Sequence, residues 1–409
     1  MASSASSGGN SVFTTSWGRI LLPALIFQSV AIGGAYATGR EIVEFGAKYG
    51  ALGWAAGFAM MVAGTVVAFL VYEVARRYGA YDYRSLLQRL IGPVYWLFDA
   101  IYLPLSIAIL AVLASATGNI LESTLNLDYW VGVGVVVAVS AVTTFYGTGI
   151  IEKFNSLGTV LLTVAYIAFA ALVIPPNWHR IVDVFRTGDH SLFPEATLAD
   201  AAVMGLTYAG MGFVIYPSTL FTVRRLRRSR DSAVSALLTG VLFVVPWFLT
   251  YLALLGFYPD PAVFDAPVPW LQMLNGHGAW IVVIFGVLVG WTLVSTAVGL
   301  IQAALARISQ NLVDRGKPEL TPRTRGMVAV VSLVVAAALS RIGIIDLIAT
   351  GYLIGAVALI AVFGIPLLVR GPYLILTAKT VARTRQPARP NPMPVPIEPD
   401  TKELNDERT

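Results

Sequence analysis

The sequence predicts an all-α integral membrane protein of about ten transmembrane helices. Of its 409 residues, 56% are hydrophobic and only 12% are charged, whereas a soluble domain carries about 25% charged residues. The apolar residues also form runs of about 20, the length of helix that crosses a hydrocarbon core of about 30 Å. These runs do not alternate as barrel strands do, and lipid offers backbone groups no partner. The spans are therefore expected to be helices.

Apolar segments and polar stretches between them define the expected organisation. The expected spans are residues 17–46, 51–75, 94–121, 129–147, 156–174, 198–222, 232–258, 278–308, 325–340 and 343–370. We divide them into an inverted 5+5 repeat within a transmembrane domain at residues 17–382, with one repeat at 17–175 and the other at 198–382. The Gly/Ser-rich stretch 1–16 and the Pro-rich, charged stretch 383–409 predict disordered tails.

Basic residues predict the orientation of these spans. With the N-terminus in the cytoplasm, all but five of the 28 lysines and arginines fall in cytoplasmic segments, which is the positive-inside pattern. The exceptions are Arg40, Lys48, Arg180, Arg186 and Arg341. We expect a multi-pass protein of the cell membrane with both termini cytoplasmic. Because the net charge of +5 is spread over loops, we expect the lipid bilayer as a partner and no nucleic acid.

The residue types present exclude several kinds of chemistry. The chain has no cysteine, which removes disulfides, thiolate metal sites and cysteine nucleophiles. Its histidines, His179, His190 and His277, fall in outer segments. An enzyme would need clustered acids, histidines or a nucleophile–base pair at membrane depth. The sequence shows none of these, so we expect neither an enzyme nor an organic cofactor.

Two glycine-rich stretches predict interrupted helices. The first span contains Gly33, Gly34 and Gly39, and the sixth contains Gly210 and Gly212; each glycine weakens a helix by about 1 kcal/mol relative to Ala. The alternative is close helix packing through small residues. Interruptions at corresponding positions of two repeats are the stronger indication of a transport site. Freed N–H groups attract an anionic group, and freed C=O groups coordinate a cation such as Na⁺.

Adjacent hydroxyl groups lie deep in the eighth span, at Ser295 and Thr296. They can bond to carbonyl groups one turn earlier in the same helix, or they can ligate an ion. The residues alone leave both interpretations open.

These features resemble the ten-helix core of the leucine-transporter fold, found in the amino acid–polyamine–organocation superfamily and the neurotransmitter:sodium symporters. The first helix, with GGAYATGREIVEFG, is most similar to the uncharacterised YkvI-like bacterial membrane proteins. The resemblance implies discontinuous helices one and six. It also implies one Na⁺ site between helices one and eight. The implied ligands are the carbonyl oxygens of Val30, Gly33 and Thr292 and the hydroxyls of Ser295 and Thr296.

The resemblance further implies a gate and a substrate site. Arg40 and Asp346 match the family's outer gating pair, although a local Arg40–Glu44 pair is an alternative. Tyr102 matches a tyrosine that faces the substrate carboxylate, although packing is its commoner role. Ala37 stands where the second Na⁺ site of these symporters has Asn, which argues against that site. The expected substrate-binding residues are Gly34, Ala35, Tyr36, Thr38, Tyr102, Tyr208, Gly210, Gly212 and Phe213.

The implied function is a symporter that couples Na⁺ to a small polar solute such as an amino acid or related zwitterion. A proton-coupled carrier that uses Asp99 or Glu73 is an alternative, although Glu73 can instead pair locally with Arg76 and Arg77. A membrane sensor that binds a solute without carrying it is another. Glu41 and Glu44 are expected near the outer mouth of the bundle, in contact with solvent.

Overall fold

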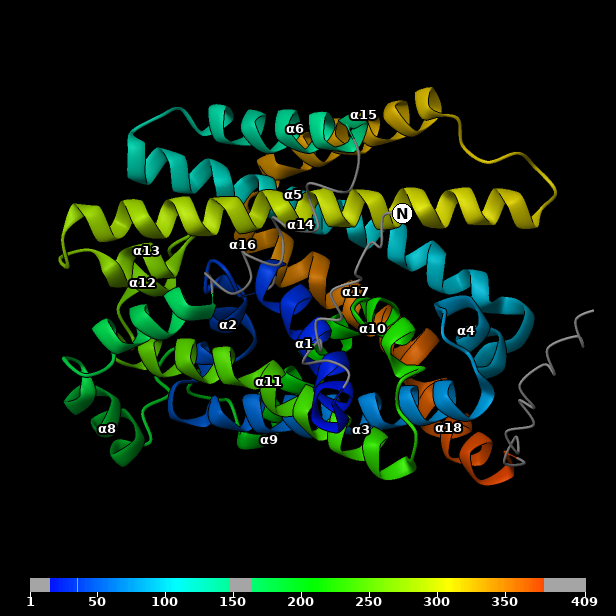
Figure 1. Ribbon diagram of the computed structural model, residues 1–409. Coiled ribbons are helices and arrows are strands. Elements are labelled where there is room, and N and C mark those ends of the chain that lie inside the picture. Colours follow the sequence, from blue (N-terminus) through cyan, green and yellow to red (C-terminus); the bar gives the residue numbers. More distant parts are fainter. Residues whose placement is uncertain (1–14, 35, 147–162, 379–409) are drawn as a thin grey trace, which may run out of the picture.

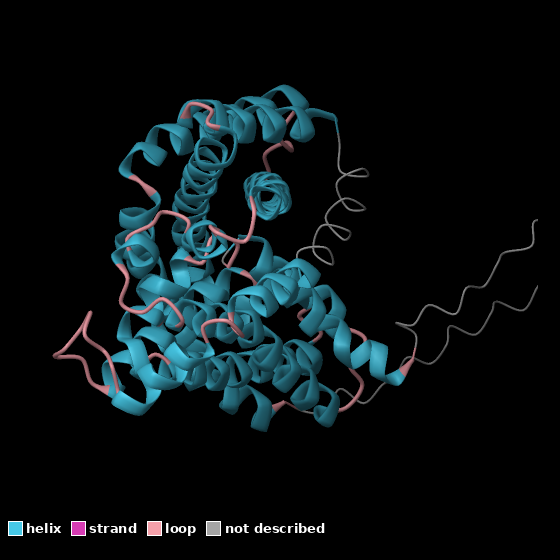
Figure 2. Cartoon of the chain, turned by 90° about the vertical axis from the view of Figure 1, so that its left-hand side faces the viewer, coloured by secondary structure: helices cyan, strands magenta, loops and turns pink. Residues whose placement is uncertain are grey.

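The computed structural model describes residues 15–34, 36–146 and 163–378, and every regular element within them is helical. Figure 1 shows the long helices α3, α5, α11 and α14 running across the molecule in broadly the same direction. The view in Figure 2 is turned by 90°, and it looks along the axes of several of these helices. The all-α fold predicted from composition is confirmed.

The first half of the chain follows the predicted order of spans. Its helices within the predicted spans are α1 (Ser16–Gly34), α2 (Arg40–Phe45), α3 (Trp54–Tyr78), α5 (Trp96–Leu125), α6 (Tyr129–Tyr146) and the apolar helix Thr163–Val173. Shorter elements between them are η2 (Ala47–Leu52), α4 (Tyr83–Ile91), η3 (Gly92–Tyr95) and α8 (Trp178–Thr187). Helix α4 begins where Asp82 accepts a hydrogen bond from the amide of Ser85, a typical N-cap.

The second half also follows the predicted order of spans. Its helices within those spans are α9 (Leu198–Met211), η4 (Gly212–Val214), α10 (Tyr216–Val223), α11 (Ser229–Leu255), α14 (Ala279–Asp314), α15 (Pro322–Leu339), α16 (Ile344–Asp346), η6 (Leu347–Tyr352), α17 (Leu353–Leu359), η7 (Ile360–Gly364) and α18 (Ile365–Thr377). The short elements α12 (Pro261–Phe264), α13 (Pro269–Leu274) and η5 (Ser340–Ile342) connect them. Both η6 and η7 are π-helical, a feature that the sequence did not predict.

By length and composition, six of the described helices can cross a membrane. The bent pair Leu198–Val214 and Tyr216–Val223 makes a seventh candidate, and Trp17–Ala31, Tyr129–Val142 and Thr163–Val173 are shorter apolar helices. Each of the expected spans therefore contains helix, while the count of ten crossings stays a prediction. The proposed tails, apart from residues 15 and 16, lie outside the described residues.

Both predicted helix interruptions are present. Helix α1 ends at Gly34 and α2 begins at Arg40, after a turn in which Gly39 has a φ of 81° that only glycine adopts easily. Ala35 lies outside the described residues. In the sixth span the two helical parts are bent by 61°, at Ile215 after the 3₁₀ turn of η4.

Small residues pack the long helices closely at other places in the bundle. A Cβ added at Gly205 of α9 would lie 2.0 Å from the carbonyl oxygen of Ala56 in α3. A Cβ at Gly240 of α11 would lie 2.0 Å from the hydroxyl oxygen of Thr65 in α3. These contacts place α3 against α9 and α11. The packing role of glycine is therefore present in this chain at Gly205 and Gly240.

Candidate solute and cation site

The interrupted helices border a partly open cavity of about 70 Å³. Four predicted site residues line it: Val30 of α1, Tyr208 of α9, Gly212 of η4 and Thr296 of α14. Its other lining residues are Glu41, Ile109, Met211, Val214, Ile215, Phe243, Leu300 and Tyr352. The cavity thus joins the broken helices to α14. We call it the central cavity.

The turn of the first-helix break is held by groups from other helices. The hydroxyl of Tyr166 donates to the carbonyl oxygen of Tyr36. The backbone amide of Trp270 donates to the carbonyl oxygen of Thr38 at 3.3 Å. The hydroxyl of Tyr36 donates to the carbonyl oxygen of Phe243 at 3.0 Å. Freed carbonyl groups at membrane depth need such partners. In this conformation Tyr36 and Thr38 therefore make contacts within the protein.

Glu41 occupies the wall of the central cavity and was misplaced by the sequence interpretation. Its residue is only 2% exposed, and the hydroxyl of Tyr208 donates a hydrogen bond to its Oε2. The expectation that Glu41 contacts solvent at the outer mouth is wrong. Helix α2 packs against α9 and η6, and this packing turns the carboxylate inward.

Aromatic rings surround this carboxylate. The ring centroids of Tyr36 and Tyr208 are 6.2 Å apart, and those of Tyr208 and Phe243 are 6.4 Å apart with the rings nearly parallel. Phe45 packs on Tyr208 at 4.9 Å. The cavity therefore combines one acid, tyrosine hydroxyls and aromatic faces, a combination that suits a group with positive charge.

The predicted cation ligands lie on the two helices that the resemblance implied. Val30 and Thr296 line the central cavity, and Gly33 is in the last turn of α1. The hydroxyl of Thr292 donates to the carbonyl oxygen of Leu288 at 2.8 Å, the same back-bonding considered for its neighbours. Ser295 is half-buried one residue before Thr296.

The remaining sixth-helix residues pack differently. A Cβ added at Gly210 would lie 2.7 Å from the side chain of Ile360 in η7. The ring of Phe213 packs against Phe363 at 5.4 Å. Among the expected substrate residues of the sixth span, Tyr208 and Gly212 line the central cavity, and Gly210 and Phe213 pack against span ten.

Arg40 contacts the α12–α13 segment instead of Asp346. Its guanidinium donates to the carbonyl oxygens of Phe264 and, at 3.4 Å, Ala266, and it pairs with Glu44 at 3.5 Å. Among the described residues, no ion pair joins Arg40 to Asp346. The local pair that the sequence offered as the alternative is the one observed.

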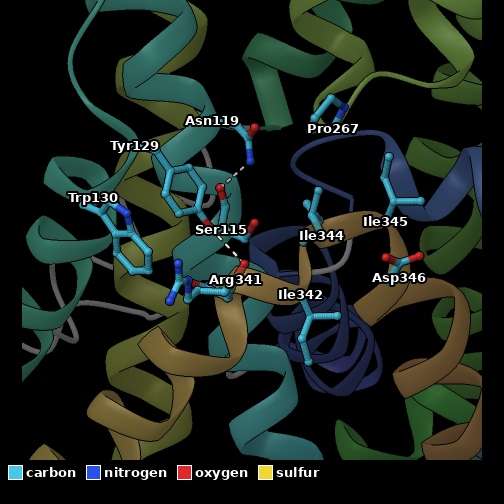
Figure 3. A pocket seen from close by; sticks show the side chains of 12 residues that line it. Ser115, Asn119, Tyr129, Trp130, Pro267, Arg341, Ile342, Ile344, Ile345 and Asp346 are labelled. Carbon is cyan, nitrogen blue, oxygen red and sulfur yellow. Dashed lines mark hydrogen bonds between the residues drawn. The ribbon is translucent and has the colours of Figure 1, made fainter.

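Asp346 belongs to a second, open pocket of about 460 Å³ at the end of α5. Figure 3 shows Ser115 and Asn119 of α5 facing the segment from Arg341 to Asp346, with Pro267 on another side. Tyr129 closes one side and donates a hydrogen bond to the carbonyl oxygen of Ser340 at 3.0 Å. This pocket lies toward the end of the bundle predicted to face outward.

A charged cluster lies at the opposite end, which is predicted to face the cytoplasm. Asp99 accepts hydrogen bonds from Arg307 and Asn311, each at 3.0 Å. The guanidinium carbon of Arg307 lies between the rings of Tyr83 and Tyr102, at 3.9 and 3.8 Å from their centroids. Tyr102 is therefore part of this cluster, and it does not appear among the described residues that line the central cavity.

Glu73 also has permanent basic partners. Its Oε1 lies 2.6 Å from Arg76 Nη2 and 2.6 Å from Arg77 Nε, as the local alternative anticipated. Arginine stays protonated at every pH of interest. The two acids considered as proton sites, Asp99 and Glu73, are thus both paired with guanidinium groups.

Comparison with known proteins gives one sequence relative and several structural ones. No protein-family profile matches the chain. The uncharacterised membrane protein YkvI of Bacillus subtilis is 22% identical over 271 residues, which cover 64% of this chain and 75% of YkvI.

Two solved structures superpose over most of the chain. A mutant of the manganese transporter of Eremococcus coleocola has a TM-score of 0.57 and 13% identity, covering 91% of this chain and 87% of that protein. MhsT in complex with L-phenylalanine has a TM-score of 0.58 and 14% identity, covering 87% of this chain and 97% of MhsT. Together with the interrupted first and sixth helices, this similarity establishes that the chain has the leucine-transporter fold.

Proposed function

We propose that the protein is a secondary transporter that couples Na⁺ to the movement of a small polar solute. The observation that carries this proposal is the central cavity, whose wall is shared by the break of span six, by Val30 of α1 and by Thr296 of α14. A continuous, tightly packed bundle would offer no such space. Irregular backbone at membrane depth is tolerated where it lines a cavity, and transporters of several folds place their sites there.

The expected ion ligands suit Na⁺. The carbonyl oxygens of Val30, Gly33 and Thr292 with the hydroxyls of Ser295 and Thr296 form a set without a carboxylate, although the carboxylate of Glu41 lines the same cavity as Val30 and Thr296. Ca²⁺ sites usually include carboxylates, so a monovalent hard cation is the better match. An ion that bridges α1 and α14 would favour one arrangement of these two helices over the other.

The α12–α13 segment supplies the part that must move. Its Trp270 contacts the turn of the first-helix break. Its Phe264 and Ala266 contact Arg40. We propose that these contacts hold the first-helix break on the predicted outer side of the cavity. Alternating access would break them and open the cavity outward.

The structural neighbours support a small solute. MhsT was solved in complex with L-phenylalanine, and the Eremococcus coleocola protein is a manganese transporter. We favour an amino acid or related zwitterion because helix ends with free N–H groups attract a carboxylate.

Flux measurements in proteoliposomes test the proposal. Uptake of labelled amino acids is compared with an inward Na⁺ gradient and with K⁺ in its place. We expect uptake only with Na⁺, and its loss in Thr296→Ala. Thr117→Ala, which removes a buried hydroxyl on α5 that bonds only to its own helix, is the matched control. Uptake driven equally by K⁺, or by a pH gradient alone, would contradict Na⁺ coupling.

A further inference from the structure

Glu41 differs from the other buried acids in having no basic partner. The buried acids among the described residues are Glu41, Glu73 and Asp99. Glu73 pairs with Arg76 and Arg77, and Asp99 pairs with Arg307. For Glu41 the described residues provide no ion pair. A buried carboxylate without a counter-charge is costly, so Glu41 either holds a proton or pairs with a cation from outside the protein.

The hydrogen bonds around Glu41 indicate which cation. The hydroxyl of Tyr208 donates a hydrogen bond to its carboxylate, and Tyr352 lines the same cavity. Burial favours the protonated acid, whereas a hydroxyl donor and a bound cation favour the carboxylate. A carboxylate has about four acceptor positions, so positions remain for the N–H groups of an ammonium ion.

The walls of the central cavity match an ammonium group on an apolar body. Tyr208, Phe243 and Tyr352 line it beside Glu41, and aromatic faces attract organic cations. Ile109, Met211 and Leu300 supply the apolar remainder. Its volume of about 70 Å³ is roughly half of the ~150 Å³ that holds benzene in an engineered cavity. The cavity is partly open, so this volume takes the ammonium head and the first carbons, and a longer body extends through the open side.

We propose that Glu41 recognises the ammonium group of the transported solute, so that the substrate class is small amines and amino acids rather than simple carboxylic acids. This inference rests on the proposed function, because it names the solute for the same cavity. It assigns Glu41 a role that is separate from the Na⁺ ligands on α1 and α14.

Thermal unfolding of the purified full-length protein tests this assignment in potassium buffer without Na⁺. The probes are n-butylammonium chloride, potassium butyrate and n-butanol, which share a four-carbon body. We expect n-butylammonium alone to raise the Tm, because a ligand that binds only the folded state stabilises it. In Glu41→Gln the apparent affinity for n-butylammonium should fall at least about tenfold, since an ion pair becomes a neutral contact.

Glu44→Gln is the matched control, because it neutralises an acid on the same helix that already pairs with Arg40 and Lys48. It should keep the response to n-butylammonium. If Glu41→Gln does not fold, Tyr208→Phe serves instead: it removes one hydroxyl donor, keeps the ring, and should weaken n-butylammonium binding while the response to butanol stays absent.

Equal stabilisation by butyrate would overturn the inference, and so would an unchanged affinity of Glu41→Gln for n-butylammonium. A third contrary result is that Glu41→Gln loses pH-driven uptake but still binds n-butylammonium. That result would make Glu41 a proton acceptor. The failure of Na⁺ coupling is recognised separately. It would abolish Na⁺-driven uptake but leave n-butylammonium binding in potassium buffer in place.

Discussion

Replacing Asp99 by Asn tests whether the cluster at the predicted cytoplasmic end stabilises the bundle. Asp99 is 5% exposed and lies 3.0 Å from the guanidinium of Arg307. Removing one member of a buried ion pair costs about 3–5 kcal/mol, because the other charge stays buried without its partner. The stacking of Arg307 between Tyr83 and Tyr102 remains and offsets part of this cost. We expect a loss near the lower end of that range.

The assay is thermal unfolding in detergent, in which the remaining fraction of folded protein is measured at each temperature. The control is Asp183→Asn, which breaks ion pairs with Arg180 and Arg186 whose side chains are 41% and 78% exposed. Exposed pairs contribute about 0–1 kcal/mol, so this variant should unfold almost as the parent does.

Adding Arg307→Gln to Asp99→Asn should recover part of the lost stability, because the unpaired charge is then gone. The reasoning is refuted if Asp99→Asn is as stable as the control and instead changes the pH dependence of uptake. That result would favour the proton site that the sequence offered as an alternative.

Two further predictions concern packing and the carboxylate. Gly205→Ala should destabilise the protein strongly, since its Cβ would lie 2.0 Å from the carbonyl oxygen of Ala56. The control Gly134→Ala meets nothing within 4 Å and should be neutral. Equal Tm values for the two variants would contradict this prediction. Tyr208→Phe should cost about 1–3 kcal/mol in unfolding free energy, because Glu41 loses a buried hydrogen bond, and an unchanged Tm would contradict that contact.

The fold could be predicted from sequence because its determinants are local. Long apolar runs fix helices at membrane depth, and the glycines near positions 33–39 and 210–212 weaken two of them. The convergence of Val30, Tyr208, Gly212 and Thr296 on one cavity followed from the resemblance and from these breaks. The structure brings these four residues to one cavity, while their roles as ligands, the ion and the solute remain proposals.

The remaining features depend on contacts between distant segments. Glu41 turns inward because α2 packs on η6, whose π-helical geometry has no clear signal in the sequence. Tyr102 joins Asp99 because Arg307, over 200 residues later, lies between two tyrosine rings. Arg40 meets the α12–α13 segment, and nothing in the sequence predicted the position of that segment over the first-helix break. A buried tyrosine such as Tyr208 needs a hydrogen-bond partner, which is the one general signal that could have pointed to a nearby acid.

The absence of native cysteine allows the most direct test of an ion-bridged cavity between α1 and α14. A single Leu300→Cys variant lines the same cavity and keeps the hydroxyl of Thr296. It is exposed to a small thiol reagent in proteoliposomes with Na⁺ or with K⁺, and Ser191→Cys, at an exposed loop position, is the control. We predict that Na⁺, but not K⁺, slows modification at position 300 and leaves position 191 unaffected, because the ion would occupy the space beside Thr296. Equal rates in both salts at position 300, under conditions where uptake proceeds, would contradict the account.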